Sequence, residues 1–507
     1  MLPSAFRPKG VAIVTLLAAG TLTLGAQDQR HSDFDARLRE GHELMSQLKY
    51  EDAFLAYRDA RGSQDARVRV QAGTGAVRAM LKVGYYAEAV RIASEVASRD
   101  PENSAALAID GDALWASSLF PEAEARYEEA LKINPNDPVA LHGRGRSLAA
   151  QRRFSEAIVD VNKALEIDDK QAAYHYTLAS IYEDTRDFKS ASEALADYLG
   201  LIPSRNENDL AKWAETQVEF LRDFGYVTPF EEISRQQSYT MPFREHEGRL
   251  LVKGRLNGLV EVEFALDTGT DQTFITPAIA RRANVKSKST LQTAGVGDLG
   301  YGFRGLQIAK FDQIDIGPLR MRNVTGVIKS PSLKDLPREE GSGFSPLSLG
   351  FSVRVDYAKR QLTMARTLPK WDAPVRVPLR MQRLAIVRGI VNGNTPAGFV
   401  LDTGGEATSL SRRVAGTLGM DPELRRVPAQ VYGSSGWDRR AFLMPYVDIE
   451  FASGVGLQQR SVPVVNLDAP SALLGVNIGG IIGHELLSRY TLTIDLNRAE
   501  VGLEPIK

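Results

Sequence analysis

The chain has 507 residues, of which 43% are hydrophobic and 25% charged, a composition typical of several folded globular domains. Its formal net charge of -1 gives no basic excess for nucleic acid, and the absence of cysteine excludes disulfides, thiol catalysis and zinc–thiolate sites. The six histidines are scattered, which argues against a metal enzyme or a Ser–His–Asp enzyme, and we expect neither metal nor cofactor.

The N-terminus has the pattern of an export signal. Arg7 and Lys9 precede the apolar run VAIVTLLAAGTLTLGA, which ends in small residues suited to cleavage before Gln27. We therefore predict a signal peptide over residues 1–26 and an exported protein, periplasmic or secreted. The alternative is an uncleaved membrane anchor, although the run is short for a span of ~20 apolar residues. Only in that case do we expect membrane contact.

A periodic pattern fills the front half of the chain. An aromatic residue lies three positions before each of five alanines, which are 36, 34, 34 and 34 residues apart: Ala53, Ala89, Ala123, Ala157 and Ala191. Twelve residues before four of these alanines lie the small residues Gly41, Gly111, Gly145 and Ala179, with Val77 as the exception in repeat two.

This phase resembles the tetratricopeptide repeat, in which small residues let the two helices of a hairpin cross closely. Prolines twelve residues after three of the alanines, at Pro101, Pro135 and Pro203, would end the second helix. The resemblance implies about five repeats over residues 34–205, stacked as an all-α solenoid.

The array is expected to end in a capping or linker helix over residues 206–237. Leu210, Trp213, Val218 and Leu221 lie there at helical spacing, although this stripe could instead be a partner site. We expect the concave face of the array to bind a protein partner. The alternative is a spacer that only positions the following domains, since fold alone does not define function.

From about residue 238 the sequence changes to short Val, Ile and Phe segments with Gly and Asn turns, which predict strands. Asp-Thr-Gly follows an apolar segment twice, at Asp267 and Asp402, and an Asn-Gly lies ten residues before each aspartate. Each Asn-Gly predicts a hairpin turn that feeds the strand carrying the aspartate.

The similarity continues downstream of both aspartates. Two further aspartates follow Asp267 after 48 and 89 residues and follow Asp402 after 46 and 93 residues, namely Asp315, Asp356, Asp448 and Asp495. The matched order indicates a tandem duplication, with lobe one at residues 238–370 and lobe two at residues 371–507.

The segments LDTGT, LDTGG and GGIIGHELLSRYTLTIDL resemble the retropepsin-like aspartic peptidases over about residues 238–507. The resemblance implies a bilobal all-β fold of the pepsin type in which Asp267 and Asp402 are catalytic. It also implies that the threonine hydroxyls hydrogen-bond between the two aspartate loops, whose supporting residues are Thr268, Gly269, Thr403 and Gly404.

Two adjacent carboxyl groups suit the hydrolysis of an amide without a metal or a covalent intermediate. Like charges in contact cannot both ionise, so the pair shares one proton. The ionised partner then acts as a base on water and the protonated partner donates toward the carbonyl. Which aspartate holds the proton stays open, as does the alternative that Asp-Thr-Gly is merely a turn.

The two lobes differ in the strand beside the aspartate loop. Ile481-Ile482-Gly483 in lobe two matches the family pattern, and the neighbouring His484 is expected to be structural. Lobe one has no clean hydrophobic pair before Gly343, so Asp267 is expected to lie in an altered frame.

Two glycine-rich segments predict flaps that close over a substrate. They cover Ala294–Phe303 and Val431–Phe442, with Tyr301 and Trp437 as candidate substrate contacts, and ordinary hairpins are the alternative.

These patterns together predict an exported aspartic endopeptidase that acts on peptide or protein substrates, with an array that recruits a substrate protein or a regulator. No nucleotide is expected, because the sequence has no GxGxxG or GxxxxGK[ST] phosphate loop. One alternative is a non-catalytic scaffold on a degenerate protease fold, which binds extended peptides by strand addition. Another is that lobes from different chains pair, so that the active unit is a dimer.

Overall fold

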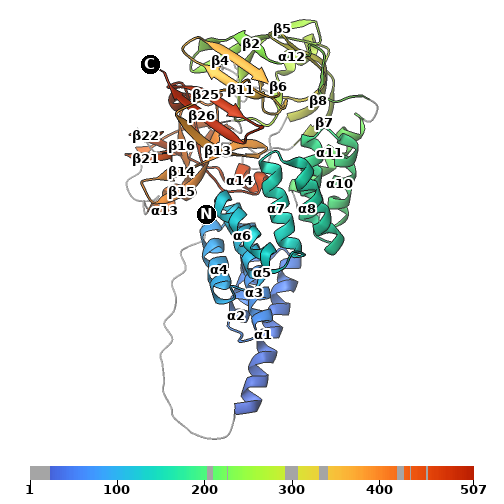
Figure 1. The fold of residues 1–507 in the computed structure, drawn as a ribbon, viewed down its shortest axis with the longest axis vertical. Coiled ribbons are helices and arrows are strands. Elements are labelled where there is room, and N and C mark those ends of the chain that lie inside the picture. Colours follow the sequence, from blue (N-terminus) through green and yellow to red (C-terminus); the bar gives the residue numbers. More distant parts are fainter. Residues whose placement is uncertain are drawn as a thin grey trace.

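The computed structural model describes residues 23–202, 209–224, 227–291, 306–329, 341–418, 427–433, 436–452 and 455–506. A helical array lies below two β lobes in the view of Figure 1, and helices α7 and α11 of the array approach the lobes. The predicted combination of an all-α repeat array and a bilobal β region is therefore confirmed. Within the described residues, no helix has both the length and the apolar character that a membrane span requires.

The array consists of helical hairpins that stack in chain order. Its helices are α1 (Thr23–Ser46), α2 (Tyr50–Ala60), α3 (Ala66–Val83), α4 (Tyr86–Arg99), α5 (Ser104–Ala116), α6 (Phe120–Ile133), α7 (Pro138–Ala150), α8 (Phe154–Ile167), α9 (Ala172–Asp184) and α10 (Phe188–Gly200). Helix α11 (Asp209–Arg222) packs on α10 and buries Trp213 and Leu221, in the position predicted for a cap.

Glycines make room for large side chains between the paired helices. A Cβ on Gly111 would lie 2.6 Å from the ring of Tyr127, and a Cβ on Gly41 would lie 2.5 Å from the ring of Tyr57. Both rings are almost fully buried. The steric reason given for the small-residue phase of the repeat is therefore confirmed at these two hairpins.

Lobe one is built on a mixed sheet with the strand order β1-β9-β6-β10-β5-β4-β8-β7, and β3 pairs with β4. Its elements are β1 (Glu231–Glu232), β3 (Arg244–His246), β4 (Arg249–Leu256), β5 (Val260–Leu266), β6 (Thr273–Ile275), α12 (Pro277–Arg282), β7 (Ser287–Leu291), β8 (Leu306–Ile316), β9 (Leu319–Ile328) and β10 (Gly343–Phe344).

Lobe two repeats this plan, with β24 beside β15 as β10 lies beside β5. Its strands are β14 (Leu384–Val391), β15 (Thr395–Leu401), β16 (Ser409–Ser411), β17 (Val427–Pro428), β18 (Val431–Gly433), β19 (Gly436–Asp438), β20 (Phe442–Met444), β21 (Val447–Ala452), β22 (Val455–Gln459), β23 (Val462–Val465) and β24 (Ile478–Ile482). Its helices are α13 (Arg412–Thr417), α14 (Asp468–Leu474) and α15 (His484–Leu487).

A shared sheet joins the two lobes. Its strands run in the order β2 (Tyr239–Pro242), β12 (Gln361–Ala365), β11 (Ser352–Asp356), β25 (Tyr490–Asp495), β26 (Glu500–Pro505) and β13 (Val375–Gln382). The central pair is antiparallel, with Val353 opposite Ile494 and Val355 opposite Leu492. Because these side chains are buried, each lobe completes the core of the other.

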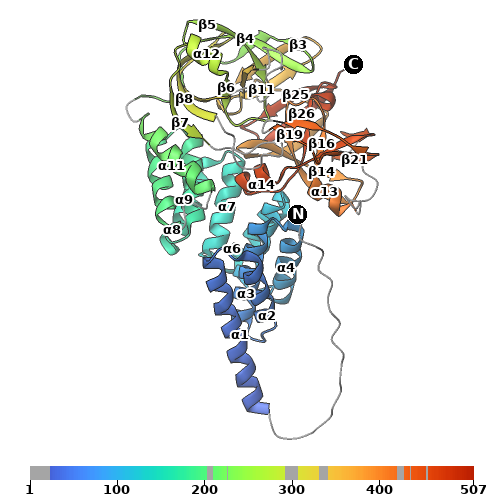
Figure 2. The ribbon, with the colours of Figure 1, turned by 180° about the vertical axis from the view of Figure 1, so that it is seen from behind.

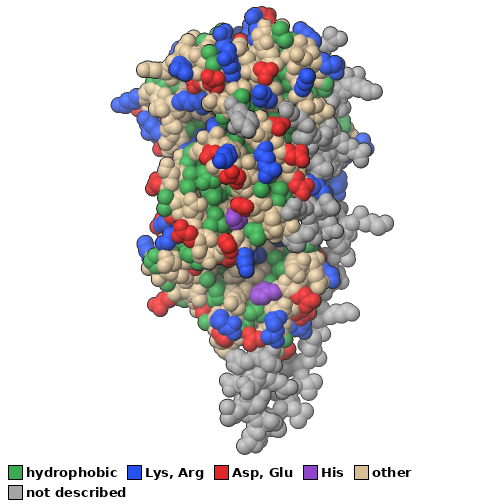
Figure 3. Space-filling model, turned by 90° about the vertical axis from the view of Figure 1, so that its right-hand side faces the viewer, with side chains coloured by type: hydrophobic (Ala, Val, Ile, Leu, Met, Phe, Trp, Pro, Cys, Tyr) green, Lys and Arg blue, Asp and Glu red, His purple; other side chains and the backbone are tan. Residues whose placement is uncertain are grey.

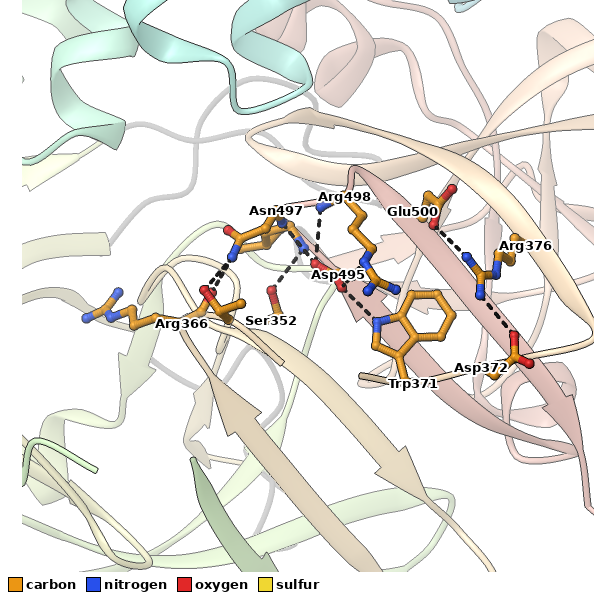
Figure 4. A network of polar contacts seen from close by, with 11 residues as sticks. Ser352, Arg366, Trp371, Asp372, Arg376, Asp495, Asn497, Arg498 and Glu500 are labelled. Carbon is orange, nitrogen blue, oxygen red and sulfur yellow. Dashed lines mark hydrogen bonds and ion pairs between the residues drawn. The ribbon is translucent and has the colours of Figure 1, made fainter. Parts of the chain in front are cut away.

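Asp495 at the end of β25 ties the segment between the lobes to this sheet (Figure 4). Its Oδ2 accepts a 2.7 Å hydrogen bond from Nε1 of Trp371, and its Oδ1 accepts one of 3.0 Å from the backbone N of Asn497. The backbone N of Leu496, the residue directly after Asp495, donates to Oγ of Ser352 in β11. This landmark of the duplication therefore has a structural role.

The predicted Asn-Gly turns are confirmed, and they reveal the true register of the duplication. Asn257 and Asn392 both have positive φ, of 50° and 48°, between the paired strands. Each asparagine exchanges hydrogen bonds with a residue 56 positions later, which is Gln313 in lobe one and Asp448 in lobe two. The predicted equivalence of Asp315 and Asp448 is therefore wrong by two residues.

The array docks on the lobes, as both ribbon views show (Figures 1 and 2). Trp115 and Phe120 of the array belong to the same buried cluster as Ile386, Val400 and Ile478 of lobe two. Acidic and basic side chains are interspersed over the face seen in Figure 3, in line with the near-zero net charge.

Candidate active site

Equivalent strands deliver the two predicted aspartates to one place. Asp267 follows β5 and Asp402 follows β15, and each strand runs parallel to a strand of its own lobe, β10 or β24. The backbone N of Asp267 donates to the carbonyl of Phe344 at 3.0 Å, and that of Asp402 donates to the carbonyl of Ile482 at 3.0 Å.

The expectation that Asp267 lies in altered surroundings is therefore wrong, because the backbone of Asp267 is held by the neighbouring strand in the same way as that of Asp402. In lobe one, Phe344-Ser345 takes the position that Ile482-Gly483 takes in lobe two. The sequence pattern was misleading because the hydrophobic residue of lobe one follows Gly343 instead of preceding it.

The two threonines clasp the loops together in a reciprocal way. Oγ1 of Thr268 donates to the carbonyl of Leu401 at 2.8 Å and accepts from the backbone N of Thr403 at 3.1 Å. Oγ1 of Thr403 donates to the carbonyl of Leu266 at 2.9 Å and accepts from the backbone N of Thr268 at 3.2 Å. Both threonines are buried, and the two lobes pair within one chain.

The glycines of the two motifs lie against the carboxyl groups of the opposite lobe. A Cβ on Gly404 would lie 2.6 Å from Cγ of Asp267, and a Cβ on Gly269 would clash with Cγ of Asp402. The two carboxyl groups lie close enough together that each shifts the pKa of the other. A side chain at either glycine would therefore push the carboxyl groups apart.

The two carboxyl groups have different environments. Burial raises the pKa of both groups, and the negative charge of Asp402 raises the pKa of Asp267 further. Oδ1 of Asp402 accepts backbone hydrogen bonds from Gly404 at 2.8 Å and Gly405 at 2.9 Å, whereas Oδ1 of Asp267 accepts one from Gly269 at 3.0 Å. Because these bonds favour the ionised form, Asp267 is the better holder of a shared proton.

Two basic residues that the sequence reasoning missed contribute positive charge near the pair. Lys329 follows β9 and lowers the pKa of Asp267, while Arg249 at the start of β4 lowers that of Asp402. The Nζ of Lys329 lies 5.4 Å from the ring centroid of Phe274. Their signal in the sequence is weak, because both are single basic residues at strand ends.

The predicted flaps are described in part. Ala294–Phe303, including Tyr301, lies outside the described residues. In the second segment, β18 and β19 pair as a hairpin, with Tyr432 opposite Trp437. The Trp437 side chain is 38% exposed, and its contact with a substrate remains a prediction.

His484 links the lobes. Its Nε2 lies 3.2 Å from Oε1 of Glu245 in β3, and its ring packs edge-on against Tyr357. The ring is buried, which fits the structural role expected for it. Among the described residues, no group of three or more His, Cys, Asp or Glu side chains is arranged to hold a metal ion.

Two Asp-Thr-Gly loops clasped between two β lobes define a site of the aspartic protease class. Comparison with known families agrees: residues 252–353 and 387–486 match the aspartyl protease family, and residues 114–181 match the tetratricopeptide repeat. The chain therefore carries two tandem aspartyl protease domains behind a tetratricopeptide repeat array.

Curated proteins with similar sequence include organizing proteins of plants. The Hsp70-Hsp90 organizing protein of Triticum aestivum is 29% identical over 94 residues, which are 18% of this chain and 16% of that protein. The Hsp70-Hsp90 organizing protein 2 of Arabidopsis thaliana is 24% identical over 245 residues, which are 46% of this chain and 42% of that protein. The chain thus spans less than half the length of these relatives.

Solved structures that match part of this chain include a thermophilic tetratricopeptide repeat protein from Thermus thermophilus. It is 18% identical with a TM-score of 0.31, and the match covers 37% of this chain and 98% of that one. YrrB, a tetratricopeptide repeat protein with an unusual peptide-binding site, is 19% identical with a TM-score of 0.25, over 39% of this chain and 96% of that one.

Proposed function

We propose that the two lobes form an aspartic endopeptidase that hydrolyses peptide bonds with Asp267, Asp402 and a bound water. The observation that carries this proposal is the reciprocal threonine clasp, which holds the two carboxyl groups next to each other where the lobes meet. Burial of like charges in contact leaves one proton on the pair, which is the state that acid and base catalysis together require.

The environments of the two groups assign their roles in this proposal. Asp402, with two backbone donors, is the base that takes a proton from water as the water oxygen attacks the carbonyl carbon. Asp267 donates its proton to the carbonyl oxygen, which gives a tetrahedral diol. Asp402 then passes a proton to the amide nitrogen as the C–N bond breaks, and Asp267 recovers its proton from the diol.

Two further parts of the proposal concern the front of the chain. Residues 1–26 export the protein to a periplasm or to the exterior, as their signal-peptide pattern favours. The repeat array recruits a protein substrate or a regulator on its concave face, and the sequence likeness to organizing proteins supports a role in protein interaction.

One of the two reasons for the alternative of a non-catalytic scaffold is the irregular sequence of the strand beside Asp267; the other is the large repeat array. The first reason no longer applies, because that strand holds Asp267 by the same 3.0 Å backbone bond as its counterpart holds Asp402.

The direct test is cleavage of a broad peptide library by the full chain and by Asp402→Asn and Asp267→Asn variants. Each substitution removes either the proposed base or the proposed acid, so we expect a loss of at least about a thousandfold in kcat, as for residues that act as a unit. Asp372→Asn is the matched control, because that carboxylate is 90% exposed and pairs with Arg376 on the surface. Cleavage that survives Asp402→Asn, or that is equally lost in the control, contradicts the proposed mechanism.

A further inference from the structure

Arg383 lies where the array and both lobes meet. It forms the tight turn between β13 and β14 of lobe two, with a positive φ of 58°, and Gln382 pairs with Leu384 across it. Its Nη2 lies 2.9 Å from Oδ2 of Asp271 in lobe one, and its side chain is 22% exposed.

Asp271 belongs to the loop that carries the first aspartate of the pair. It lies four residues after Asp267, and the next strand, β6, begins at Thr273. The ion pair therefore fixes the end of this loop, while the clasp of Thr268 fixes its beginning. A loop held at both ends has few ways to move its carboxyl group.

The array holds the other side of the guanidinium. Its Cζ lies 4.6 Å from the ring centroid of Trp213 on α11, and Tyr176 on α9 lies beside it. The two rings pack against each other at 6.2 Å in an edge-on arrangement. Stacking on an aromatic ring uses the planar form of arginine, so Trp213 fixes both the position and the orientation of the group.

In the part of the chain that the structure describes, the equivalent contact on the other side of the pseudo-symmetric pair has no such support from the array. There the turn of lobe one at Glu247 and Gly248 approaches the loop of lobe two, and a Cβ on Gly248 would lie 3.6 Å from Cγ of Glu406. The nearby bond between His484 and Glu245 joins lobe to lobe without an array residue. The array therefore braces the loop of Asp267 and leaves that of Asp402 to the lobes.

We infer that Arg383 is a positioning residue for the active site and that helices α9 and α11 of the repeat array hold it in place. The array then contributes to catalysis by ordering the loop that carries Asp267. The inference rests on the proposed function, because it assigns the array a role in that same site. Partner binding that disturbed α9 or α11 would on this view change the geometry of the pair and not only the supply of substrate.

The test compares Arg383→Ala and Tyr176→Phe with Arg388→Ala in the full chain. Arg388 is a matched control because it also comes from lobe two and pairs with the array, through a 2.5 Å contact with Glu122, but it lies away from the aspartate loops. Two readouts are needed: the split of kcat and KM on a cleaved peptide, and amide hydrogen exchange of the segment 264–275.

Arg383→Ala should lower kcat roughly 10- to 100-fold with little change in KM, because misplaced reacting groups slow the chemical step. Tyr176→Phe should lower kcat less, by roughly fivefold, because it removes only the hydroxyl group beside the guanidinium and keeps the ring that packs on Trp213. Both variants should speed exchange in the segment 264–275, and Arg388→Ala should match the parent chain. Adding Asp271→Asn to Arg383→Ala should cost little more, since both act through one ion pair.

The inference is overturned if Arg383→Ala and Tyr176→Phe exchange in this segment as the parent chain does, or if Arg388→Ala has the same effect on it. A parent chain that cleaves nothing would count against the proposed function alone, because hydrogen exchange still decides whether Arg383 and the array order the loop. An unfolding midpoint for each variant separates this local effect from general destabilisation.

Discussion

Single residues with left-handed backbone set the turn inside each helical hairpin of the array. Leu48, Ser118, Arg152 and Arg186 have φ between 61° and 67°, and Gly84 has φ of 76° at the same place in repeat two. This conformation strains an L-residue by roughly 1–2 kcal/mol, whereas glycine adopts it readily. Four of the five hairpin turns are therefore strained, and the fifth is not, because it has a glycine at this position.

Leu48 gives the clearest test of this strain, because its side chain is 39% exposed. Leu48→Gly should raise the free energy of unfolding by about 0.5–1 kcal/mol, since the relief of strain exceeds the entropy cost of glycine. Leu48→Ala, which removes most of the side chain but keeps the strain, should have little effect. Urea unfolding of both variants measures this, and an equal gain for Ala would contradict the explanation.

The pH dependence of cleavage should also be set by single residues. Burial raises the pKa of Asp267 and of Asp402, so both limbs of the profile should lie above the ordinary aspartate pKa of ~3.9. Activity should rise with pH as Asp402 loses its proton and fall at higher pH as Asp267 loses the last one. Lys329→Met should move the upper limb to higher pH, because Lys329 lowers the pKa of Asp267. A profile of kcat/KM that centres below ~3.9 would contradict this assignment.

The packing of paired helices depends on which ring faces each glycine. The ring of Tyr127 cannot move aside, because Gly111 and Gly143 flank it and its hydroxyl forms hydrogen bonds with Asp112 and Arg146. Gly111→Ala should therefore destabilise the array by about 1–3 kcal/mol through overpacking.

Gly200 at the end of α10 is the matched control for this prediction. Among the described residues, no atom beyond its own helix turn lies within 4 Å of the Cβ it would gain, so Gly200→Ala should stabilise by about 0.5–1 kcal/mol. Thermal unfolding of both variants gives the comparison, and a similar shift of the same sign in the two would rule out the steric account.

Local pattern was sufficient to predict most of these elements. The 34-residue phase predicted the hairpins because a repeat is built from contacts close in sequence, and Asn257 and Asn392 predicted the strand turns for the same reason. Asp315 was wrongly equated with Asp448, because counting residues between matching positions cannot detect a two-residue shift of register between the two lobes.

The contacts between array and lobes could not be predicted from pattern. Glu124 pairs with Arg380 across 256 positions, and Ser118 bonds to the carbonyl of Asn477 across 359. Such contacts depend on how whole domains are placed in three dimensions. A single polar or charged residue in the sequence does not indicate which distant residue it will contact. The doubled Asp-Thr-Gly predicted that Asp267 and Asp402 would meet, but the asymmetry between them depends on backbone directions that the sequence does not specify.

For the whole molecule, the shared cluster between array and lobe two predicts a single cooperative unfolding transition. Trp115 is fully buried in that cluster, and its loss in Trp115→Ala should cost about 3–5 kcal/mol. Because Ile386 and Val400 of lobe two lose the same contacts, the lobes should unfold with the array at a lower temperature.

Ile133→Ala serves as the control, since this side chain lies on the array surface and is 45% exposed. Its effect should stay within about 0.5 kcal/mol. Scanning calorimetry with far-UV and near-UV circular dichroism checks both variants. Two separate transitions, with only the helical one displaced by Trp115→Ala, would show that the array and lobes are independent.

The position of β25 and β26 in the middle of the shared sheet has a consequence for synthesis. These strands, residues 490–505, separate β11 of lobe one from β13 of lobe two, so the sheet stays open until they leave the ribosome. A growing chain can fold its repeats early, but its two acidic loops gain their common support only at the end of translation. Chains released early would carry both aspartates and still lack the frame that keeps them together.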